Sequence, residues 1–415
     1  MGIKEYCEDI ARKSKEAFEI ISTSPTSQKN YALSLIAKQI RENKDFLIEE
    51  NKKDIEFTRS KGRSEALIDR VVLNEKRIDG IVDAIQNVIL LDDPVGKVVY
   101  SSRRPNGMIV NKIKVPIGTI LMIYEARPNV TVDAATLILK SGNTGILRGG
   151  SEAYNTNIAL SKLISKAIED AGLPKNAIQY VDRVEHEVVD ELLKIDSYID
   201  LVIPRGGEGL IRSVVEKSKI PVLRQEKGVC HVYVDKSADK EMAERITINA
   251  KTQRPSVCNA AETLLIHKDY PYKKELLEAL IKKNVKLKGC RRTLEIVSVE
   301  EAREEDYYNE YLDYIMNVKI VDSTDEAIAH IKKYGSGHTE SIVTSDYFEA
   351  NKFLSKVDSS TVMVNASTRF TDGGEFGLGA EIGISTHKLH ARGPMGLIEL
   401  TSDKWIVYGN GQVRE

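Results

Sequence analysis

One cysteine of this sequence stands where its thiol could do chemistry. Cys258 lies in the segment QRPSVCNAAETLL, which follows a polar, amphipathic stretch and precedes a short apolar run. A thiol reacts as the thiolate, and Arg254, a cation in the same loop, favours that form. Cysteine is also among the most buried residue types and can simply pack. On this segment alone, a nucleophilic and a structural role for Cys258 both stay open.

A second candidate is the asparagine of YEARPNVT, directly after a predicted buried strand. A side-chain amide at the start of the next helix can donate a hydrogen bond to an oxyanion formed at a neighbouring nucleophile, and Asn129 has that place. An asparagine before a helix is ordinarily its N-cap, which involves no chemistry. Both interpretations of Asn129 stay open on the residues alone.

Two glycine-containing turns follow predicted strands, LRGGSE at 147–152 and IPRGGEG at 203–209. Glycines between a strand and a helix let a phosphate or a ribose approach the helix N-terminus. In the first turn Arg148 would suit a 2′-phosphate, although the nearby Glu152 would weaken that interaction. Neither turn matches GxGxxG, so it is the pair of turns that predicts a dinucleotide site.

The sequence predicts no metal site. Among the 7 histidines only His387 and His390 are close enough to share a metal, and no cysteine or further histidine stands near them. The four cysteines lie far apart without paired spacing, which argues against a disulfide framework and a zinc site; they are Cys7, Cys230, Cys258 and Cys290.

Length and charge exclude several classes of protein. A chain of 415 residues suggests about two to three domains. Lys plus Arg (60) nearly balance Asp plus Glu (62), so neither nucleic acid nor an acidic membrane is an expected partner. The longest nearly uninterrupted apolar run, 117–124, is far too short for a membrane span, and the charged N-terminus lacks a signal-peptide pattern. A cytoplasmic location is expected.

The hydrophobic pattern predicts an α/β protein. Residues 1 to about 95 are mostly helical, with Ser24 as the N-cap and Pro25 as the first residue of one helix, and 100–115 form a hairpin around Pro105-Asn106-Gly107. Strands and helices then alternate in two blocks joined near 222–229. Such alternation predicts doubly wound parallel sheets, which bind ligands at the carboxyl ends of their strands. Strands are expected at 118–123, 144–147, 177–181, 201–203, 230–234, 262–266 and 318–321, and helices at 130–141, 151–171, 240–252, 271–283 and 324–334.

The order of these segments resembles the aldehyde dehydrogenase superfamily: strand, RPN turn, LRGG turn, IPRGG turn, Cys258, and then Glu310 in EYLDYIMNVKIV. Within it, the chain is most similar to the branch that reduces an acyl phosphate of glutamate in proline biosynthesis. The most specific piece is VDSTDEAIAHIKKYGSGHTESI at 321–342, and RPSVCNAAETLL and VPIGTILMIYEARPNVT are nearly as diagnostic. The resemblance covers essentially the whole chain and favours the nucleophilic interpretation of Cys258.

The resemblance implies two doubly wound parallel-sheet domains with an oligomerisation hairpin and tail. The expected parts are a cofactor-binding domain at 1–228 with a projecting hairpin at 98–116, and a catalytic domain at 229–360. Residues 361–415 are expected to return to the cofactor domain and to end in the oligomerisation tail, so a homo-oligomer is the expected assembly.

The implied reaction is the NADPH-dependent reduction of L-glutamyl 5-phosphate to L-glutamate 5-semialdehyde with release of phosphate. Cys258 attacks the acyl carbon, phosphate leaves, and the thioester is reduced by hydride. By carry-over, Asn129 and the backbone N–H of Cys258 form the oxyanion hole. The residues implied to face NADPH/NADP are Arg148, Ser151, Arg205, Gly206, Gly207 and Glu310, the last of which positions the nicotinamide ribose. Substrate contacts are expected at Arg254, Asn365, Thr368 and Arg369, although structural pairing would explain each of these residues equally well.

Two rival functions fit parts of the pattern: a general NAD(P)-dependent aldehyde dehydrogenase that oxidises free aldehydes, and an inactive scaffold of the same fold. Members that hydrolyse their thioester use the glutamate of an LELGGK segment as a base, and the matching stretch here is LRQEKG at 223–228. Arg224 falls nearest that glutamate's place and cannot accept a proton. Glu226 would restore a base if the alignment slips. The acyl phosphate would come from a separate protein, glutamate 5-kinase.

Overall fold

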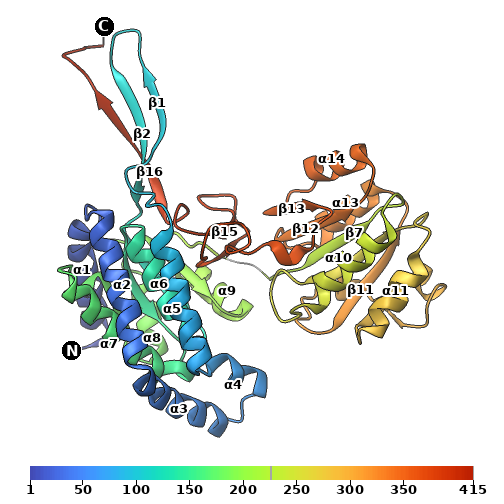
Figure 1. Cartoon of the computed structure of the whole chain (residues 1–415), viewed down its shortest axis with the longest axis horizontal. Coiled ribbons are helices and arrows are strands. Elements are labelled where there is room, and N and C mark those ends of the chain that lie inside the picture. The colour runs from blue at the N-terminus through green and yellow to red at the C-terminus, as the bar shows by residue number, and fades with distance from the viewer. Residues whose placement is uncertain (225–226, 415) are drawn as a thin grey trace. The chain divides into compact units, whose positions relative to one another are not determined.

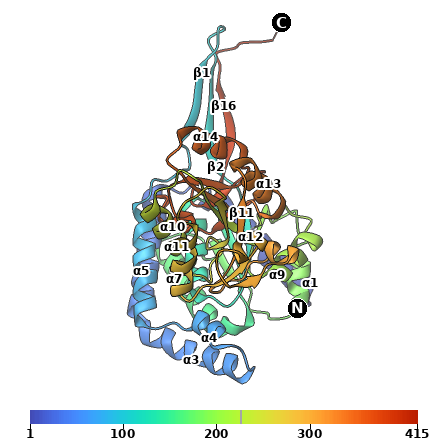
Figure 2. The same cartoon turned by 90° about the vertical axis from the view of Figure 1, so that its right-hand side faces the viewer.

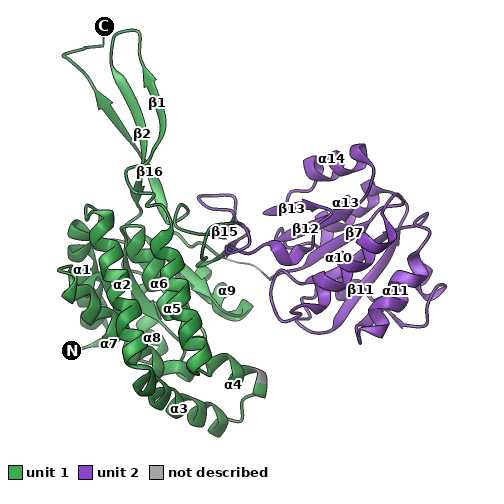
Figure 3. Cartoon of the chain, in the orientation of Figure 1, with its two compact units in different colours: residues 1–224, 377–383, 395–415 green, residues 225–376, 384–394 purple. Residues whose placement is uncertain are grey.

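The computed structural model describes residues 1–224 and 227–414, and the chain divides into two compact units (Figure 3). Unit 1 comprises residues 1–224, 377–383 and 395–415, and unit 2 comprises 225–376 and 384–394. The boundaries predicted from the sequence follow residues 228 and 360. The sequence pattern does not indicate that residues 384–394 return briefly to unit 2.

Unit 1 begins with a run of helices, as predicted: α1 (Ile3–Ile21), α2 (Thr26–Glu42), α3 (Lys44–Ser60), α4 (Glu65–Val71) and α5 (Glu75–Leu90) (Figure 1). The predicted cap of the second helix is wrong, because Pro25 takes the N-cap position and the helix begins at Thr26. Ser24 instead donates its hydroxyl to the carbonyl of Ile20 at 2.8 Å. A hydroxyl that points back to the preceding helix cannot cap the next one.

A four-stranded parallel sheet in the order β5-β4-β3-β6 forms the centre of unit 1. Its strands are β3 (Thr119–Tyr124), β4 (Thr144–Arg148), β5 (Ile178–Tyr180) and β6 (Leu201–Arg205), and its helices are α6 (Pro128–Lys140), α7 (Tyr154–Asp170), α8 (His186–Leu192) and α9 (Glu208–Lys217). Apolar side chains of α1, α8 and α9 pack on the sheet around Leu121 and Val202. The chain runs from β3 to β4 and β5 and then crosses to β6 on the other side of β3. Right-handed crossovers in opposite directions put their helices on opposite faces, which is the doubly wound arrangement.

The predicted hairpin is present in unit 1. Strands β1 (Val98–Arg103) and β2 (Ile109–Pro116) pair antiparallel, and Gly107 in the turn has φ 89°, a value that suits glycine. A third strand from the C-terminal tail, β16 (Thr401–Tyr408), pairs antiparallel with the other edge of β2. These three strands, called the arm below, extend away from the helices of unit 1 (Figures 1 and 2).

Unit 2 contains a seven-stranded sheet in the order β10-β9-β11-β8-β7-β12-β13, and its paired strands are parallel. The strands are β7 (Cys230–Val234), β8 (Ala261–His267), β9 (Lys286–Gly289), β10 (Glu300–Glu301), β11 (Ile315–Val321), β12 (Thr339–Val343) and β13 (Thr361–Val364). The helices are α10 (Lys240–Thr252), α11 (Lys273–Lys282), α12 (Arg291–Leu294), α13 (Thr324–Tyr334) and α14 (Tyr347–Lys356). A short two-stranded sheet, β14 (Gly383–Ser385) and β15 (Gly393–Met395), lies where the chain passes between the units.

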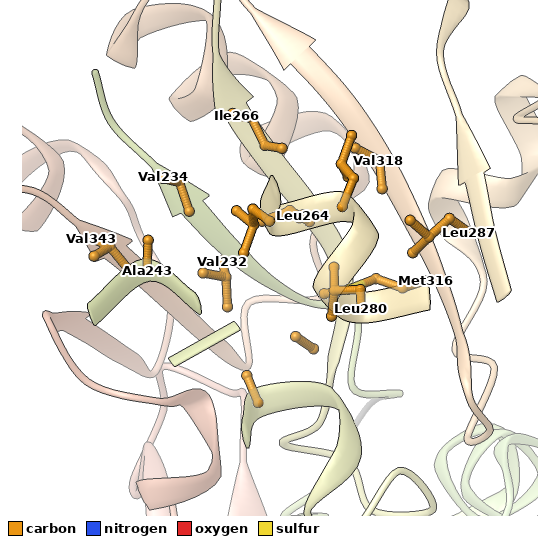
Figure 4. Close-up of a cluster of buried hydrophobic side chains, with 14 of the residues drawn as sticks. Val232, Val234, Ala243, Leu264, Ile266, Leu280, Leu287, Met316, Val318 and Val343 are labelled. Carbon is orange, nitrogen blue, oxygen red and sulfur yellow. The ribbon is translucent and has the colours of Figure 1, made fainter. Parts of the chain in front are cut away.

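Two apolar clusters hold the helices of unit 2 on its sheet. One joins α10 and α11 to the strands and includes Val232, Leu264 and Val318 (Figure 4). The other joins α13 and α14 through Ile331 and Phe353. The predicted alternation of strands and helices is therefore confirmed in both blocks. Across the described residues, no helix is both long and apolar enough to cross a lipid bilayer.

Candidate active site

Cys258 lies in the loop between α10 and β8, and its side chain is half-buried. Gly228, just before β7, packs against its backbone: a Cβ at Gly228 would overlap the carbonyl oxygen of Cys258 and lie 2.6 Å from its carbonyl carbon. The thiol of Cys230 donates to the same carbonyl at 3.2 Å. The backbone of the predicted nucleophile is therefore held by the chain segment that leads into β7.

Two predicted site residues of unit 2, Cys258 and Glu310, stand before strands, and so does Gly228, which contacts both. Gly228 precedes β7, Cys258 precedes β8, and Glu310 precedes β11. Because these strands are parallel neighbours or near neighbours, their amino ends meet at one edge of the sheet. The general expectation for α/β sheets places ligands at the carboxyl ends. Cys258 and Glu310 therefore lie at the end opposite to that expectation, whereas Asn365 follows β13 at the carboxyl end.

Arg369 clamps the Cys258 loop from the short helix η4 (Thr368–Phe370). Its Nε donates to Oε1 of Gln253 at 2.8 Å, and its Nη1 donates to Oδ1 of Asn259. Asn259 in turn donates its amide N–H to the carbonyl of Thr371 at 2.8 Å. The two residues that Arg369 binds flank Cys258 in sequence, so η4 fixes the loop on both sides of the thiol.

A second guanidinium group lies in the same region. Burial lowers the pKa of Arg369, and the charge of Arg254 lowers it further, whereas Asp372 and the thiol of Cys258 act in the opposite direction. Two cations that repel each other near the predicted nucleophile form a favourable place for an anion. The sequence singled out both arginines, but only the structure shows that Arg369 also holds the loop.

The other two predicted substrate residues have different surroundings. Asn365, with φ 56°, uses both ends of its amide on the backbone of Thr344: its Oδ1 accepts the N–H at 2.9 Å and its Nδ2 donates to the carbonyl at 3.0 Å. This pairing supports the structural explanation for Asn365. Thr368 is fully buried, and its hydroxyl has no hydrogen-bond partner among the described residues.

Glu310 accepts the backbone N–H of Gly228 at 2.9 Å through Oε1. It lies in the turn between η3 (Glu304–Tyr308) and β11, and its side chain is half-buried. Gly228 therefore contacts both the residue predicted to position the ribose and the predicted nucleophile. Glycine at 228 was not singled out from the sequence, although its place in LRQEKG was.

In unit 1, Asn129 is not a helix cap. The N-cap of α6 is Arg127, and Asn129 lies inside the first turn, where its Nδ2 donates to Oδ2 of Asp133 at 3.0 Å. Burial raises the pKa of Asp133 to about 6, while Asn129 and Arg205 oppose that shift. The capping interpretation is therefore wrong, and an amide nitrogen with two N–H groups keeps a second donor. The spacing of Asn129 and Asp133, one helical turn, was the signal in the sequence that could have found Asp133.

The two glycine turns follow β4 and β6, on either side of β3. The reversal of strand order between β3 and β6 is the switch point at which such sheets bind ligands. At the second turn, Gly207 donates its N–H to Oε2 of Glu125 at 3.1 Å, and a Cβ at Gly206 would lie 2.6 Å from the carboxyl carbon of that glutamate. A carboxylate therefore already uses one of the donors that a phosphate would take.

At the first turn, Arg148 donates to the carbonyls of Gly149 and Val184, each at 3.1 Å, while its buried Nε has no partner among the described residues. Ser151 is exposed and donates to Oε2 of Glu152 at 3.3 Å. These groups are the positive charge and hydroxyl that a phosphate requires.

The structure divides the predicted site residues between the two units. Cys258, Arg254, Glu310, Asn365, Thr368 and Arg369 belong to unit 2, and Asn129, Arg148, Ser151, Arg205, Gly206 and Gly207 belong to unit 1. Unit 2 brings Cys258, Glu310 and Arg369 together through Gly228 and the Cys258 loop, and the pairing of Asn129 with Cys258 stays a prediction. Within the described ranges no group of three or more His, Cys, Asp and Glu side chains is arranged to hold a metal ion.

Comparisons with known proteins agree with this fold. The model of the aldehyde dehydrogenase family matches residues 2–313. A gamma-glutamyl phosphate reductase from Thermodesulfovibrio yellowstonii is 54% identical over 420 residues, which is 100% of either chain. The crystal structure of the gamma-glutamyl phosphate reductase from Thermotoga maritima superimposes with a TM-score of 0.96 at 47% identity, over 99% of this chain and 100% of that one. An acetylating aldehyde dehydrogenase from Geobacillus thermoglucosidasius, 16% identical with a TM-score of 0.73, shares the fold over 100% of this chain and 98% of its own. The chain therefore belongs to the aldehyde dehydrogenase family, in its branch of gamma-glutamyl phosphate reductases.

Proposed function

We propose that this chain reduces L-glutamyl 5-phosphate to L-glutamate 5-semialdehyde and releases phosphate, the step that this branch of the family contributes to proline biosynthesis. The observation that carries the proposal is the half-buried Cys258, held between Gly228 and Arg369 with a second guanidinium group nearby. The names of the relatives at 54% identity over their full lengths support the same substrate.

In the proposed mechanism, the Cys258 thiolate attacks the C5 carbonyl carbon and the bond from that carbon to the phosphate oxygen breaks. Phosphate leaves with the bonding electron pair, and Arg254 and Arg369 stabilise its charge. Asn129 and the backbone N–H of Cys258 stabilise the negative oxygen of each tetrahedral intermediate. NADPH, when bound, supplies the hydride that reduces the thioester carbon, after which the carbon–sulfur bond breaks and the thiolate is restored.

We propose NADPH as the reductant, bound by unit 1 at the turn after β4. The unpartnered Nε of Arg148 and the exposed hydroxyl of Ser151 fit the 2′-phosphate of this cofactor. The negative charge of Glu152, which would repel a phosphate, is partly neutralised because Arg63 donates to its Oε1 at 3.3 Å. Arg205, Gly206 and Gly207 would contact the remainder of the dinucleotide.

The choice between an acyl phosphate and a free aldehyde follows from how the thioester is released. Arg224, the residue nearest the place of the hydrolytic base, cannot accept a proton, and Glu226, the rival base, lies outside the described residues. Water is then a poor nucleophile for the thioester. In the reverse direction, inorganic phosphate must therefore attack the thioester in place of water.

The reverse reaction tests this proposal. With L-glutamate 5-semialdehyde and NADP, we expect sustained NADPH formation in phosphate buffer and at most one turnover per active site without phosphate. Sustained turnover without phosphate would instead support the general aldehyde dehydrogenase. In the forward direction, NADPH oxidation should require glutamate 5-kinase, ATP and glutamate together, because the kinase makes the labile substrate. We propose the cytoplasm as the compartment, where these charged small molecules are available.

We also propose that the arm joins copies of this chain into a homo-oligomer. Its strands expose large apolar side chains, among them Trp405 at 57% and Tyr408 at 60% of their surface. Strand β16 pairs only with β2 among the described strands, so it is an edge strand whose outer backbone groups can pair with another chain. Exposed apolar area on a strand edge is typical of an association surface.

A single substitution on the arm tests the oligomer. Trp405→Glu should shift the mass measured by light scattering toward that of the monomer, because a carboxylate cannot be buried in an apolar interface without a partner. Ser402→Glu, at another exposed position of β16, is the matched control and should leave the mass unchanged. An unchanged mass for Trp405→Glu would show that the arm does not form the interface.

A further inference from the structure

A buried ion pair in unit 2 lies outside the proposed catalytic steps. Nζ of Lys251 in α10 and Oε2 of Glu262 in β8 are 2.8 Å apart, and both side chains are fully buried. Burial raises the pKa of Glu262 and lowers the pKa of Lys251, while the charge of each partner opposes the shift of the other. Buried pairs of this kind add little stability compared with apolar residues of similar volume. Stability alone therefore does not explain the ion pair between Lys251 and Glu262.

The second oxygen of Glu262 provides an explanation. Oε1 accepts the backbone N–H of Leu312 at 3.4 Å, in the turn that carries Glu310. Leu312 has φ 54°, a left-handed conformation that is unfavourable for a bulky residue and needs support from its surroundings. Tyr311 anchors the same turn by donating its hydroxyl to Oδ1 of Asn317 at 2.9 Å. The turn is thus held by the buried carboxylate of Glu262 and by the hydroxyl of Tyr311.

This turn leads back to the predicted nucleophile. Glu310 accepts the N–H of Gly228 at 2.9 Å, and Gly228 packs on the backbone of Cys258. Glu262 itself belongs to the strand that begins directly after the Cys258 loop. Three contacts, of Glu262 with Leu312, of Glu310 with Gly228 and of Gly228 with Cys258, therefore join segments that are otherwise connected only along the chain.

We propose that Glu262 is a positioning residue for Glu310. Lys251 fixes the carboxylate of Glu262, and the second oxygen of that carboxylate holds the backbone of Leu312 so that Glu310 keeps its hydrogen bond to Gly228. Loss of this support should weaken the binding of NADPH, since Glu310 is the residue expected to contact the nicotinamide ribose. That part of the inference rests on the proposed function, whereas the holding of the turn does not.

Two matched double variants isolate the hydrogen bond to Leu312. Removing one charge alone would leave the other buried and unpaired, which is strongly destabilising, so both charges are removed together. Lys251→Met/Glu262→Gln keeps a carbonyl oxygen that can accept the Leu312 N–H. Lys251→Met/Glu262→Met has nearly the same volume and no oxygen. The two proteins therefore differ in the amide group at position 262, whose oxygen can accept the N–H and whose NH2 group replaces the oxygen that bound Lys251.

Hydrogen exchange measured by mass spectrometry on peptides covering 308–315 reports directly on the backbone hydrogen bond that holds the turn. We expect exchange of the Leu312 amide to be about 5- to 10-fold faster in the Met/Met protein than in the Met/Gln protein, the effect of one lost hydrogen bond. Peptides from β7 and β12 serve as the internal control and should exchange alike in both. Equal exchange at 308–315 in the two proteins would overturn the proposal.

Steady-state kinetics test whether Glu262 affects the binding of NADPH. The KM for NADPH should be about 5- to 10-fold higher in the Met/Met protein, with a smaller change in kcat. Adding Glu310→Ala to both should abolish this difference, because the effect acts through Glu310. Faster exchange without a change in the KM for NADPH would overturn the link to the cofactor. Loss of NADPH oxidation in every protein, wild type included, would reject the proposed function while the exchange result still decides the role of Glu262.

Discussion

Cys258→Ser should abolish turnover while leaving NADPH binding nearly unchanged. A serine hydroxyl lacks the low pKa and the nucleophilicity of a thiolate, so the covalent step cannot proceed. The loop itself should survive, because its contacts with Gly228, Cys230 and Arg369 involve backbone atoms of Cys258 or its neighbours. Turnover is measured in the kinase-coupled forward assay, and binding is measured by titrating the fluorescence of NADPH.

The other three cysteines are the controls for this experiment. Burial raises the pKa of Cys7 to about 11 and raises the pKa of Cys230 well above its ordinary value, so neither thiol ionises near neutral pH. Cys290 follows β9, which is separated from β8 by β11 in the sheet. Its sulfur lies 3.3 Å from the hydroxyl oxygen of Thr293. Their serine variants should stay active. The assignment of the nucleophile would fail if Cys258→Ser kept about a tenth of the wild-type rate.

Alkylation of the wild-type enzyme distinguishes an enzyme from an inactive scaffold of the same fold. Iodoacetamide should modify Cys258 first and remove activity in proportion, because this thiol is half-buried in a loop and has two guanidinium groups nearby. The half-buried Cys290 is the internal comparison. Peptide mapping by mass spectrometry identifies the modified residue.

Local structure was predictable where local chemistry decides it. The strand 230–234 and the helices 240–252 and 324–334 have the bounds that the sequence indicates. Each helix begins after a side chain that accepts a backbone N–H, Asp239 for α10 and Ser323 for α13. The hairpin of the arm follows from its Asn-Gly pair in the same way.

Contacts between distant parts of the chain were not predictable from one sequence. Nothing in the residues of β16 indicates that it pairs with β2, because an alternating strand has no preferred partner until the fold brings one close. The same holds for Gly228 and Cys258, and for Glu262 and Leu312, whose contacts depend on the order of strands in the sheet. The chemistry-bearing residue types were therefore recognisable, whereas the residues that hold them in place were not.

The failed cap at Ser24 shows a limit within local structure as well. The sequence Thr-Ser-Pro-Thr allows the serine either to cap the next helix or to bond the previous one, and propensity does not separate these. In the folded chain the carbonyl of Ile20, at the end of α1, is within reach of the Ser24 hydroxyl. The end of α1 offers that hydroxyl an acceptor, and α2 begins at Thr26 with Pro25 at its N-cap position and no side-chain cap.

Asn129→Ala should lower turnover by about 10² to 10³, the usual cost of removing one oxyanion donor, with a modest effect on the KM for the acyl phosphate. Thermal stability should change little, because the side chain of Asn129 caps no backbone group of α6 and donates instead to the carboxylate of Asp133. A large fall in Tm with a near-normal rate per folded molecule would show that the amide serves the helix and not the reaction.

Asp133 supplies the matched comparison, because it holds the same amide without reaching the substrate in the proposed mechanism. Asp133→Asn keeps the shape and an acceptor oxygen but removes the charge, so turnover should fall by less than about tenfold. Since burial raises the pKa of Asp133 to about 6, the folded protein binds a proton there that the unfolded chain has already lost, and stability from this group declines as pH rises from about 4 to 6. Asp133→Asn should remove that part of the decline in Tm. If Asp133→Asn lowered turnover as much as Asn129→Ala does, the carboxylate itself would belong to the reaction, and the oxyanion assignment of Asn129 would have to be revised.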